Sequence, residues 1–200
     1  MSGFDEKVLT IESLEEMLEA CGGKISGTDT NDGDYDSIRS LWQKELASET
    51  NGKLDWYNKG FEYWEAEANC PLSDDGVLGG YGKLTPVDVR DSNKFLDEVI
   101  AIRPELNFNK AADCGAGIGR VSKHFLLSRF AHVDLIEQSP RLLASSAKYI
   151  GEPDCQRTTC VLLGLQDFNP EPASYDVIWI QWVIGHLHDL DFVTFFRFYF

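Results

Sequence analysis

The sequence predicts an α/β fold built on a parallel β-sheet, and three observations lead to that prediction. Short apolar segments alternate with segments of helical periodicity over the second half of the 200-residue chain. A glycine-rich turn joins the first of these strands to a helix, and an acidic residue ends the next strand. Alternation at this spacing favours βαβ units and a parallel sheet. With 43% hydrophobic and 12% aromatic residues, the chain can bury one sizeable core.

Residues 1–52 differ from the remainder and are predicted to form an acidic, helical and partly disordered extension to a main domain at residues 53–200. Two stretches of helical periodicity flank residues 22–36, which are rich in Gly, Asp, Thr and Ser and indicate a flexible linker. The apolar positions of the two predicted helices are Ile11, Leu14, Leu18, Ile38, Leu41, Trp42 and Leu46.

An aromatic helix and a glycine-rich loop come next. The helix carries Trp56, Tyr57, Phe61 and Trp64 along one side, which is typical of core packing, and ends before Pro71. Residues 76–82 read GVLGGYG and predict a mobile loop. Such a loop is either an ordinary turn or a lid over a site.

Four strands and their helices are predicted from residue 92 onward. A helix over 92–102 is stopped by Pro104, and Asp189 can cap a final helix. Ser139-Pro140 is a good N-cap and first-turn pair for the helix that Gly151 closes. The predicted strands are 110–114, 131–137, 158–163 and 175–181, and the first two are separated by a helix over 119–128.

The sharpest signal is the sequence DCGAGIGR at residues 113–120, directly after the first strand. Its glycines let the backbone turn tightly and approach a ligand closely, and the following helix presents free N–H groups. Glu137 lies 22 residues beyond Gly115, at the end of the second strand. An acid in that place can accept both ribose hydroxyls, so the two features together predict a nucleoside site.

The glycine spacing distinguishes two kinds of nucleoside. Dinucleotide folds have GxGxxG, with a pyrophosphate at the start of the helix. Here Gly115, Gly117 and Gly119 are each separated by one residue, and Asp113 stands two positions before the first. A carboxylate there would repel a pyrophosphate but would suit the ammonium of a methionine moiety. The pattern therefore favours S-adenosylmethionine over a nicotinamide dinucleotide and predicts a methyltransferase.

Several segments resemble the eukaryotic protein N-terminal methyltransferases, a class I family with a Rossmann-like sheet. They are DCGAGIGR at 113–120, GLQDF at 164–168, YDVIWIQWVIGH at 175–186, Tyr63-Trp64 and LGGYG at 78–82. The resemblance covers roughly residues 54–195, and WIQWVIGH is fairly specific to the family. It implies methyl transfer from S-adenosylmethionine to the free α-amino group of proteins that begin Xaa-Pro-Lys or Xaa-Pro-Arg.

The resemblance also implies which residues bind the cofactor. Gly115 and Arg120 would hold its methionine end, and Gln181 would lie near the transferred methyl group. The family has Asp where this chain has Glu137, and the longer side chain still reaches ribose hydroxyls. The full set is Asp113, Gly115, Gly117, Arg120, Glu137, Gln138, Ser139, Leu165, Gln166 and Gln181.

On the substrate side, the resemblance makes Trp182 the wall for the substrate's proline and His186 the base. Trp64, Leu78 and Gly79 resemble lid residues at the entrance. An α-amino group has a pKa of about 7.7–8.0, so it must lose a proton before it attacks, and histidine titrates in the range to accept it. Without the resemblance, His186 would be interpreted as an ordinary loop histidine.

Charge and composition narrow the partners. A net charge of −15 disfavours nucleic acid and suits a cationic peptide, although it equally serves solubility. No apolar run approaches the ~20 residues of a membrane span, and we see no secretory signal. The five cysteines lack CxxC pairs, so we expect reduced thiols and no metal site. The resemblance implies a location in the nucleus and cytoplasm. His188 is expected at the surface.

About four of the family's seven strands are present, so the chain is expected to be C-terminally truncated. Residues 175–180 would then form an uncovered apolar edge, which invites aggregation or a partner. We therefore expect poor solubility and weak or no catalysis. The alternatives are a non-catalytic binding module that docks through this edge, a methyltransferase for a small molecule, and a nicotinamide-dependent oxidoreductase.

Overall fold

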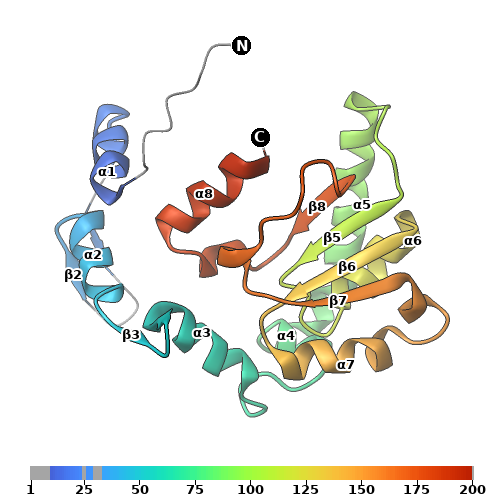
Figure 1. Ribbon diagram of the computed structural model, residues 1–200. Coiled ribbons are helices and arrows are strands. Elements are labelled where there is room, and N and C mark those ends of the chain that lie inside the picture. The colour runs from blue at the N-terminus through green and yellow to red at the C-terminus, as the bar shows by residue number, and fades with distance from the viewer. Residues whose placement is uncertain (1–9, 24–25, 29–32, 200) are drawn as a thin grey trace. The chain divides into compact units, whose positions relative to one another are not determined.

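A computed structural model describes residues 10–23, 26–28 and 33–199 of the chain (Figure 1). The chain divides into two compact units, one of residues 1–59 with 186–200 and the other of Gly60–Gly185. The domain boundary predicted after residue 52 stays a prediction.

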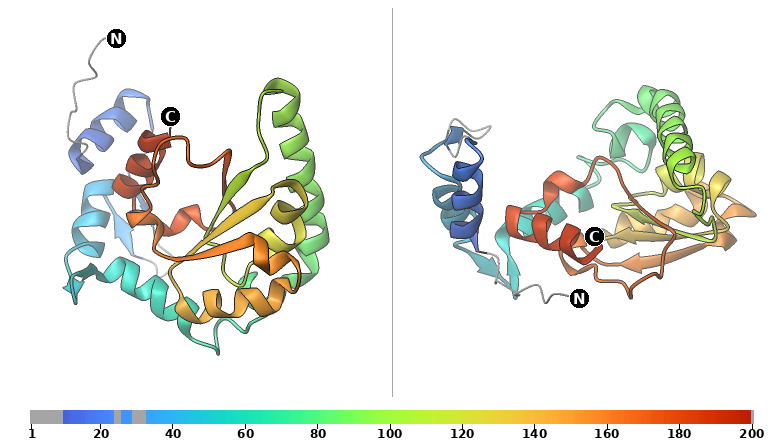
Figure 2. Two further views of the ribbon diagram at one scale, coloured as in Figure 1. Left: turned by 45° about the vertical axis from the view of Figure 1, so that its right-hand side comes forward. Right: turned by 90° about the horizontal axis from the view of Figure 1, so that it is seen from above.

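The second unit is built on a four-stranded parallel sheet (Figures 1 and 2). Its strands are β5 (Lys110–Cys114), β6 (His132–Glu137), β7 (Thr158–Leu162) and β8 (Val177–Ile180). They lie in the order β7-β6-β5-β8. The four predicted strands are thus confirmed to within two residues at each end. The order third-second-first-fourth is that of a Rossmann-like sheet, which confirms the predicted fold class.

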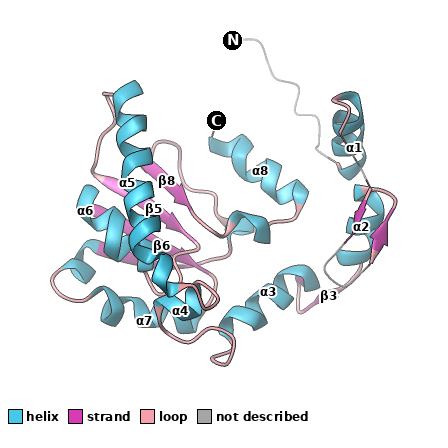
Figure 3. Cartoon of the chain, turned by 180° about the vertical axis from the view of Figure 1, so that it is seen from behind, coloured by secondary structure: helices cyan, strands magenta, loops and turns pink. Residues whose placement is uncertain are grey.

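The helices of this unit share one hydrophobic core with β5 and β6. They are α5 (Thr85–Ile102), the π-helical turn η2 (Ser122–Leu126) that continues into α6 (Leu127–Arg129), and α7 (Pro140–Ile150). Figure 3 shows α5 and α6 on the same side of the sheet. Phe125, Leu126 and Val133 are fully buried in the core. Cys114 is buried in β5, as a small apolar residue would be.

Three features of this unit differ from the predictions. Helix α5 begins at Thr85 instead of residue 92, because Pro86 starts its first turn although that turn has little apolar periodicity. The predicted loop is partly helical: α4 (Asp74–Val77) is capped by Ser73, and η1 (Gly82–Leu84) follows. The aromatic side of α3 (Asp55–Glu65), a helix that belongs to this unit only from Gly60 onward, is half-buried instead of forming core.

The first unit contains the predicted N-terminal helices, α1 (Ile11–Ala20) and α2 (Ile38–Glu45), and the C-terminal helix α8 (Asp189–Tyr199). Part of the predicted linker, residues 24–25 and 29–32, lies outside the described residues. Its described residues include the strand pair β1 (Gly27–Thr28) and β2 (Asp34–Tyr35). A second short pair, β3 (Glu49–Thr50) and β4 (Lys53–Leu54), precedes α3.

Hydrogen bonds to carboxylates tie α2 and the start of α3 to α8. Trp42 Nε1 donates to Asp189 Oδ2 at 2.7 Å, and Tyr57 Oη donates to Asp191 Oδ2 at 2.5 Å. His188 Nε2 lies 3.0 Å from the same Asp191 oxygen. The surface position predicted for His188 is wrong, because its ring packs at 5.7 Å from both Trp42 and Tyr57 and is 6% exposed.

Among the helices of the described ranges, none combines the length and the apolar character that a bilayer span requires.

Candidate functional site

The carboxyl ends of β5, β6 and β8 bring the predicted site residues of the second unit to one edge of the sheet. Cys114 of β5 pairs with Ile136 of β6 on one side and with Ile180 of β8 on the other. Gly115, Glu137 and Gln181 therefore follow on adjacent strands. The neighbours β5 and β8 are first and fourth in the chain, and open α/β sheets bind ligands at such a switch point.

The turn after β5 needs its glycines for two reasons. Gly115, Gly117 and Gly119 have φ angles of 71°, 56° and 86°, in the left-handed region that favours glycine. Space is also short: a Cβ on Gly115 would lie 2.5 Å from Val183 Cγ2, and one on Gly119 would lie 2.9 Å from Ile150 Cδ1. Gly115 and Gly119 therefore require glycine both for their backbone conformation and for the close approach of neighbouring side chains.

Asp113 faces the interior in this structure. Its Oδ2 accepts hydrogen bonds from the backbone N and Oγ of Ser122, at 3.0 Å and 2.6 Å, and the residue is 2% exposed. Burial raises the pKa of Asp113 to about 6, against the lowering effect of the Ser122 hydrogen bonds. Asp113 anchors the helix that follows the turn. Its contact with the cofactor's ammonium stays a prediction.

Glu137 closes the turn from the end of β6. Its Oε2 accepts from Gly117 N at 2.9 Å, and its Oε1 accepts from Ser139 N at 2.8 Å. Burial raises the pKa of Glu137, although these backbone N–H groups oppose the shift. In a dinucleotide site, a pyrophosphate accepts hydrogen bonds from the free N–H groups at the start of the helix that follows the turn. Here the Glu137 carboxylate already accepts from Gly117 N, and its negative charge would repel a pyrophosphate. The carboxylate still offers lone pairs to ribose hydroxyls, so the turn fits a nucleoside without phosphates.

Ser139 serves as a connector. It is fully buried, and its Oγ accepts from Leu142 N at 3.1 Å as the N-cap of α7 while donating to Glu65 Oε2 at 2.5 Å. Gln138, between Glu137 and Ser139, is half-buried. Ser139 therefore fixes the end of α3 against the start of α7.

Arg141 holds the chain around Trp64. Its guanidinium donates to the carbonyl oxygens of Glu65 and Cys70, each at 2.7 Å, and to that of Trp64 at 3.0 Å. The half-buried Trp64 ring packs against a small cluster that includes the buried Cys70 and Ile118. The sequence prediction missed Glu65 and Arg141, because contacts with carbonyl oxygens leave no trace in residue spacing.

The remaining predicted residues lie on short helical turns. Leu78 ends α4, directly after Val77, whose Cγ1 would meet a Cβ on Gly117 at 3.4 Å. Gly79 follows at a φ of 57° and is exposed. Leu165 is buried at the start of η4 (Leu165–Asp167), and the next residue, Gln166, is half-buried.

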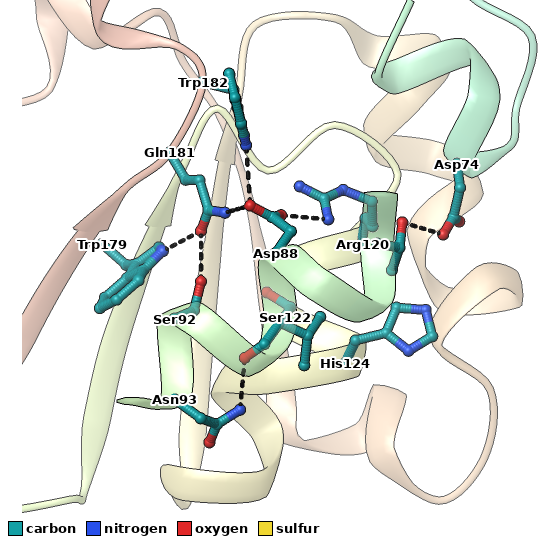
Figure 4. Close-up of polar contacts among 12 residues, drawn as sticks. Asp74, Asp88, Ser92, Asn93, Arg120, Ser122, His124, Trp179, Gln181 and Trp182 are labelled. Atoms are coloured by element: carbon teal, nitrogen blue, oxygen red, sulfur yellow. Dashed lines mark hydrogen bonds and ion pairs between the residues drawn. The ribbon is translucent and has the colours of Figure 1, made fainter. Parts of the chain in front are cut away.

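An unpredicted carboxylate, Asp88, connects the glycine turn to the end of β8 (Figure 4). Its Oδ2 accepts from Arg120 Nη1 at 2.7 Å. Its Oδ1 accepts from Gln181 Nε2 at 2.5 Å and from Trp182 Nε1 at 3.2 Å. The signal that could have identified it is the Thr-Pro-Val-Asp start of α5, since Pro and an acid mark the first turn of a helix.

Trp182 has a backbone conformation that is unusual for a large side chain. Its φ is 62°, and its side chain is 73% exposed. Left-handed backbone at a residue other than glycine costs of order 1–3 kcal/mol and concentrates at functional sites. The strain is held by the indole hydrogen bond to Asp88 and by Val183, which packs against Gly115.

His186 ends η5 (Ile184–His186) and opens the C-terminal segment of the first unit. Its backbone carbonyl accepts from Trp56 Nε1 at 2.8 Å. Desolvation by its neighbours lowers the pKa of the ring, although part of it reaches solvent. The lower pKa favours the neutral form, which can accept a proton. Its role as the base stays a prediction.

The chain is similar to curated proteins over most of its length. It is 45% identical over 177 residues to alpha N-terminal protein methyltransferase 1 of Dictyostelium discoideum, covering 86% of this chain and 64% of that protein. It is 44% identical over 143 residues to N-terminal Xaa-Pro-Lys N-methyltransferase 1 of Rattus norvegicus, covering 71% of this chain and 63% of that protein. The chain thus spans a little under two thirds of these relatives.

A solved structure has the same fold. It is a SAM-dependent methyltransferase of Leishmania major that is 35% identical, with a TM-score of 0.75 over 87% of this chain and 68% of that one. The model of the AdoMet-dependent proline di-methyltransferases matches residues 52–199. Both findings confirm the resemblance seen in the sequence and identify S-adenosylmethionine as the cofactor. The chain belongs to the family of AdoMet-dependent proline di-methyltransferases.

Proposed function

We propose that this chain serves the transfer of a methyl group from S-adenosylmethionine to the free α-amino group of proteins that begin Xaa-Pro-Lys or Xaa-Pro-Arg. One observation carries the proposal: the segment Gln181–Val183 packs directly on the glycine turn, with Val183 in the space that a Cβ on Gly115 would need. The strained, exposed Trp182 therefore stands beside the turn that we assign to the cofactor. The relatives named for Xaa-Pro-Lys N-methylation support the choice of substrate.

The cofactor, when bound, supplies a methyl group on a sulfonium. Residues of this chain bind and orient the substrate's amino terminus and remove its proton. The exposed Trp182 indole offers a flat apolar surface for a proline ring, and its N–H group is held by Asp88. His186, with its lowered pKa, accepts the proton that the substrate's ammonium must lose. Alignment of the amine with the methyl group lowers the activation free energy further, and positioning of this kind can contribute roughly 7–11 kcal/mol.

The charge of the protein supports a basic substrate. A net charge of −15 attracts a peptide whose third residue is Lys or Arg and whose amino terminus carries a further positive charge. Attraction of this kind weakens with added salt. The predicted location, nucleus and cytoplasm, accompanies the proposal and rests on the resemblance.

The test is methyl transfer to peptides, followed by mass spectrometry. Methyl transfer by this chain, which we expect to be weak, should label a peptide that begins Ser-Pro-Lys, whereas its N-acetylated copy should gain no methyl groups because the lone pair is blocked. His186→Gln should lower transfer by roughly 10²–10⁴-fold, the range of general-base effects. His132→Gln is the matched control, because His132 lies at the amino end of β6, away from the carboxyl edge of the sheet.

Three outcomes would contradict the proposal. Equal labelling of the acetylated peptide would exclude the α-amino group as acceptor. Failure of the free peptide to compete with methylation of a small amine would favour the small-molecule alternative. Binding of NADH in preference to S-adenosylhomocysteine would remove the cofactor assignment itself.

A further inference from the structure

The contacts of Asp88 go beyond an ordinary ion pair. The Arg120 and Asp88 side chains are only 5% and 15% exposed, so neither charge is well solvated. A buried pair of this kind is a weak source of stability, because desolvation offsets much of the attraction. What the pair does provide is geometry. The planar guanidinium of Arg120 is held on one side by its hydrogen bond to Asp88 Oδ2, and this fixes the direction of its other N–H groups.

The second oxygen of Asp88 fixes the other side of the site. Gln181 Oε1 accepts from Trp179 Nε1 at 2.6 Å and from Ser92 Oγ at 3.3 Å, so its Nε2 is turned toward Asp88 (Figure 4). Ser92 and Asp88 are four residues apart on α5 and therefore lie on one face of the helix. The orientation of the Gln181 amide is thus determined by three partners.

The location of Asp88 suits a carboxylate. It lies in the first turn of α5, where the positive end of the helix dipole favours negative charge. Arg120 comes from the end of the glycine turn, whereas Gln181 and Trp182 come from the end of β8. A single side chain on a third element therefore sets the distance between residues assigned to the cofactor's amino-acid end and residues assigned to the acceptor.

We propose that Asp88 is a positioning residue, which aligns Arg120 for the carboxylate of the cofactor and, through its other oxygen, holds Gln181 and Trp182 at the acceptor side. The inference rests on the proposed function, because it takes Arg120 and Trp182 in the roles given there. It requires that removing the charge of Asp88 weakens recognition of the cofactor's amino-acid end more than recognition of its adenosine end.

The first test measures binding by calorimetry. Wild type, Asp88→Asn and Asp97→Asn are titrated with S-adenosylhomocysteine and with 5′-methylthioadenosine, which lacks the amino-acid end. Asp88→Asn should weaken S-adenosylhomocysteine about tenfold to a hundredfold, the worth of a hydrogen bond to a charged group, and 5′-methylthioadenosine less than about threefold. Asp97 is the matched control, since it lies on the same helix as Asp88 and also pairs with an arginine, Arg129 of α6, but its side chain is 63% exposed.

The second test follows the indole N–H groups by NMR. The signals of Trp179 and Trp182, assigned with Phe variants, should shift in Asp88→Asn, while that of Trp42, whose N–H donates to Asp189, should not. A purely structural role would weaken both ligands equally and move all indole signals together. That pattern would overturn the inference, and so would wild-type binding by Asp88→Asn.

A folding defect is distinguishable from a loss of alignment. If Asp88→Asn does not fold, Asp88→Glu keeps the charge but displaces the carboxylate, and it should show the same selective loss. Wild-type binding by Asp88→Glu would then refute the alignment. If the wild-type chain itself does not bind S-adenosylhomocysteine, the proposed function fails and not the assignment of Asp88 alone.

Discussion

Different interactions stabilise the interior of each of the two compact units. In Gly60–Gly185 a cluster of fully buried apolar side chains, among them Phe125, Leu126 and Val133, joins the helices to the sheet. In the other unit, Trp42 and Tyr57 reach α8 through hydrogen bonds to Asp189 and Asp191. Apolar burial scales with area and is insensitive to pH, whereas hydrogen bonds to carboxylates depend on a few atoms and on their protonation.

The largest effect should come from the core of the second unit. Phe125→Ala removes a fully buried ring and should lower the free energy of unfolding by about 3–5 kcal/mol, because a cavity is added to the lost burial. Urea unfolding measures it. Ile102→Ala is the control, since this side chain is 77% exposed, and equal losses for the two variants would show that the cluster is not the main source of stability.

The pH dependence should have opposite signs in the two units. Folded Asp113 keeps its proton up to pH about 6, whereas the unfolded chain releases it near 3.8. The folded state therefore holds more protons in that window, and its stability falls by about 3 kcal/mol as pH rises through it. Asp113→Asn should flatten this decline in the β5 and β6 segments, as measured by hydrogen exchange between pH 4 and pH 7, roughly the span of the two pKa values.

Asp191 provides the opposite case in the first unit. Burial alone would raise its pKa, but hydrogen bonds from His188 and Tyr57 outweigh burial and lower it. Its contribution is therefore present above the ordinary pKa of an aspartate and is lost as pH falls below it. Protection of α8 that rises on acidification would contradict this assignment.

The smallest effect should follow from a single hydrogen bond. Trp42→Phe keeps an aromatic ring but removes the donor to Asp189, and it should lower the stability of the first unit by about 1 kcal/mol. Hydrogen exchange of α8 measures the change, with the second unit as internal reference. A loss confined to the second unit would show that the division into two units does not describe the energetics.

Periodic features of the sequence predicted the fold well, whereas contacts between residues far apart in the chain could not be predicted from the sequence. The β5 strand and the glycine turn are local patterns, so strand ends, the N-cap Ser139 and the closing Gly151 could be placed directly. For Asp88 the Thr-Pro-Val-Asp start of α5 is a local signal of its place in a first turn, but not of its partners, which lie 32 to 94 residues away and which no spacing rule connects. His188 was misplaced for the same reason, since its burial depends on Trp42 and Tyr57.

The π-helical turn Ser122–Leu126 makes chain length there as important as composition. It directs both donors of Ser122 at Asp113 and places Phe125, Leu126 and Leu127 in the core. A π-helical turn holds one residue more than an α-helical turn, so deleting one residue there would restore ordinary helical winding and keep the residues after it in register. Leu127 and Phe130 would then stay in the core. A further insertion would instead rotate the residues after it by about 100° about the helix axis, so residues 122–126 should tolerate one deletion better than one insertion.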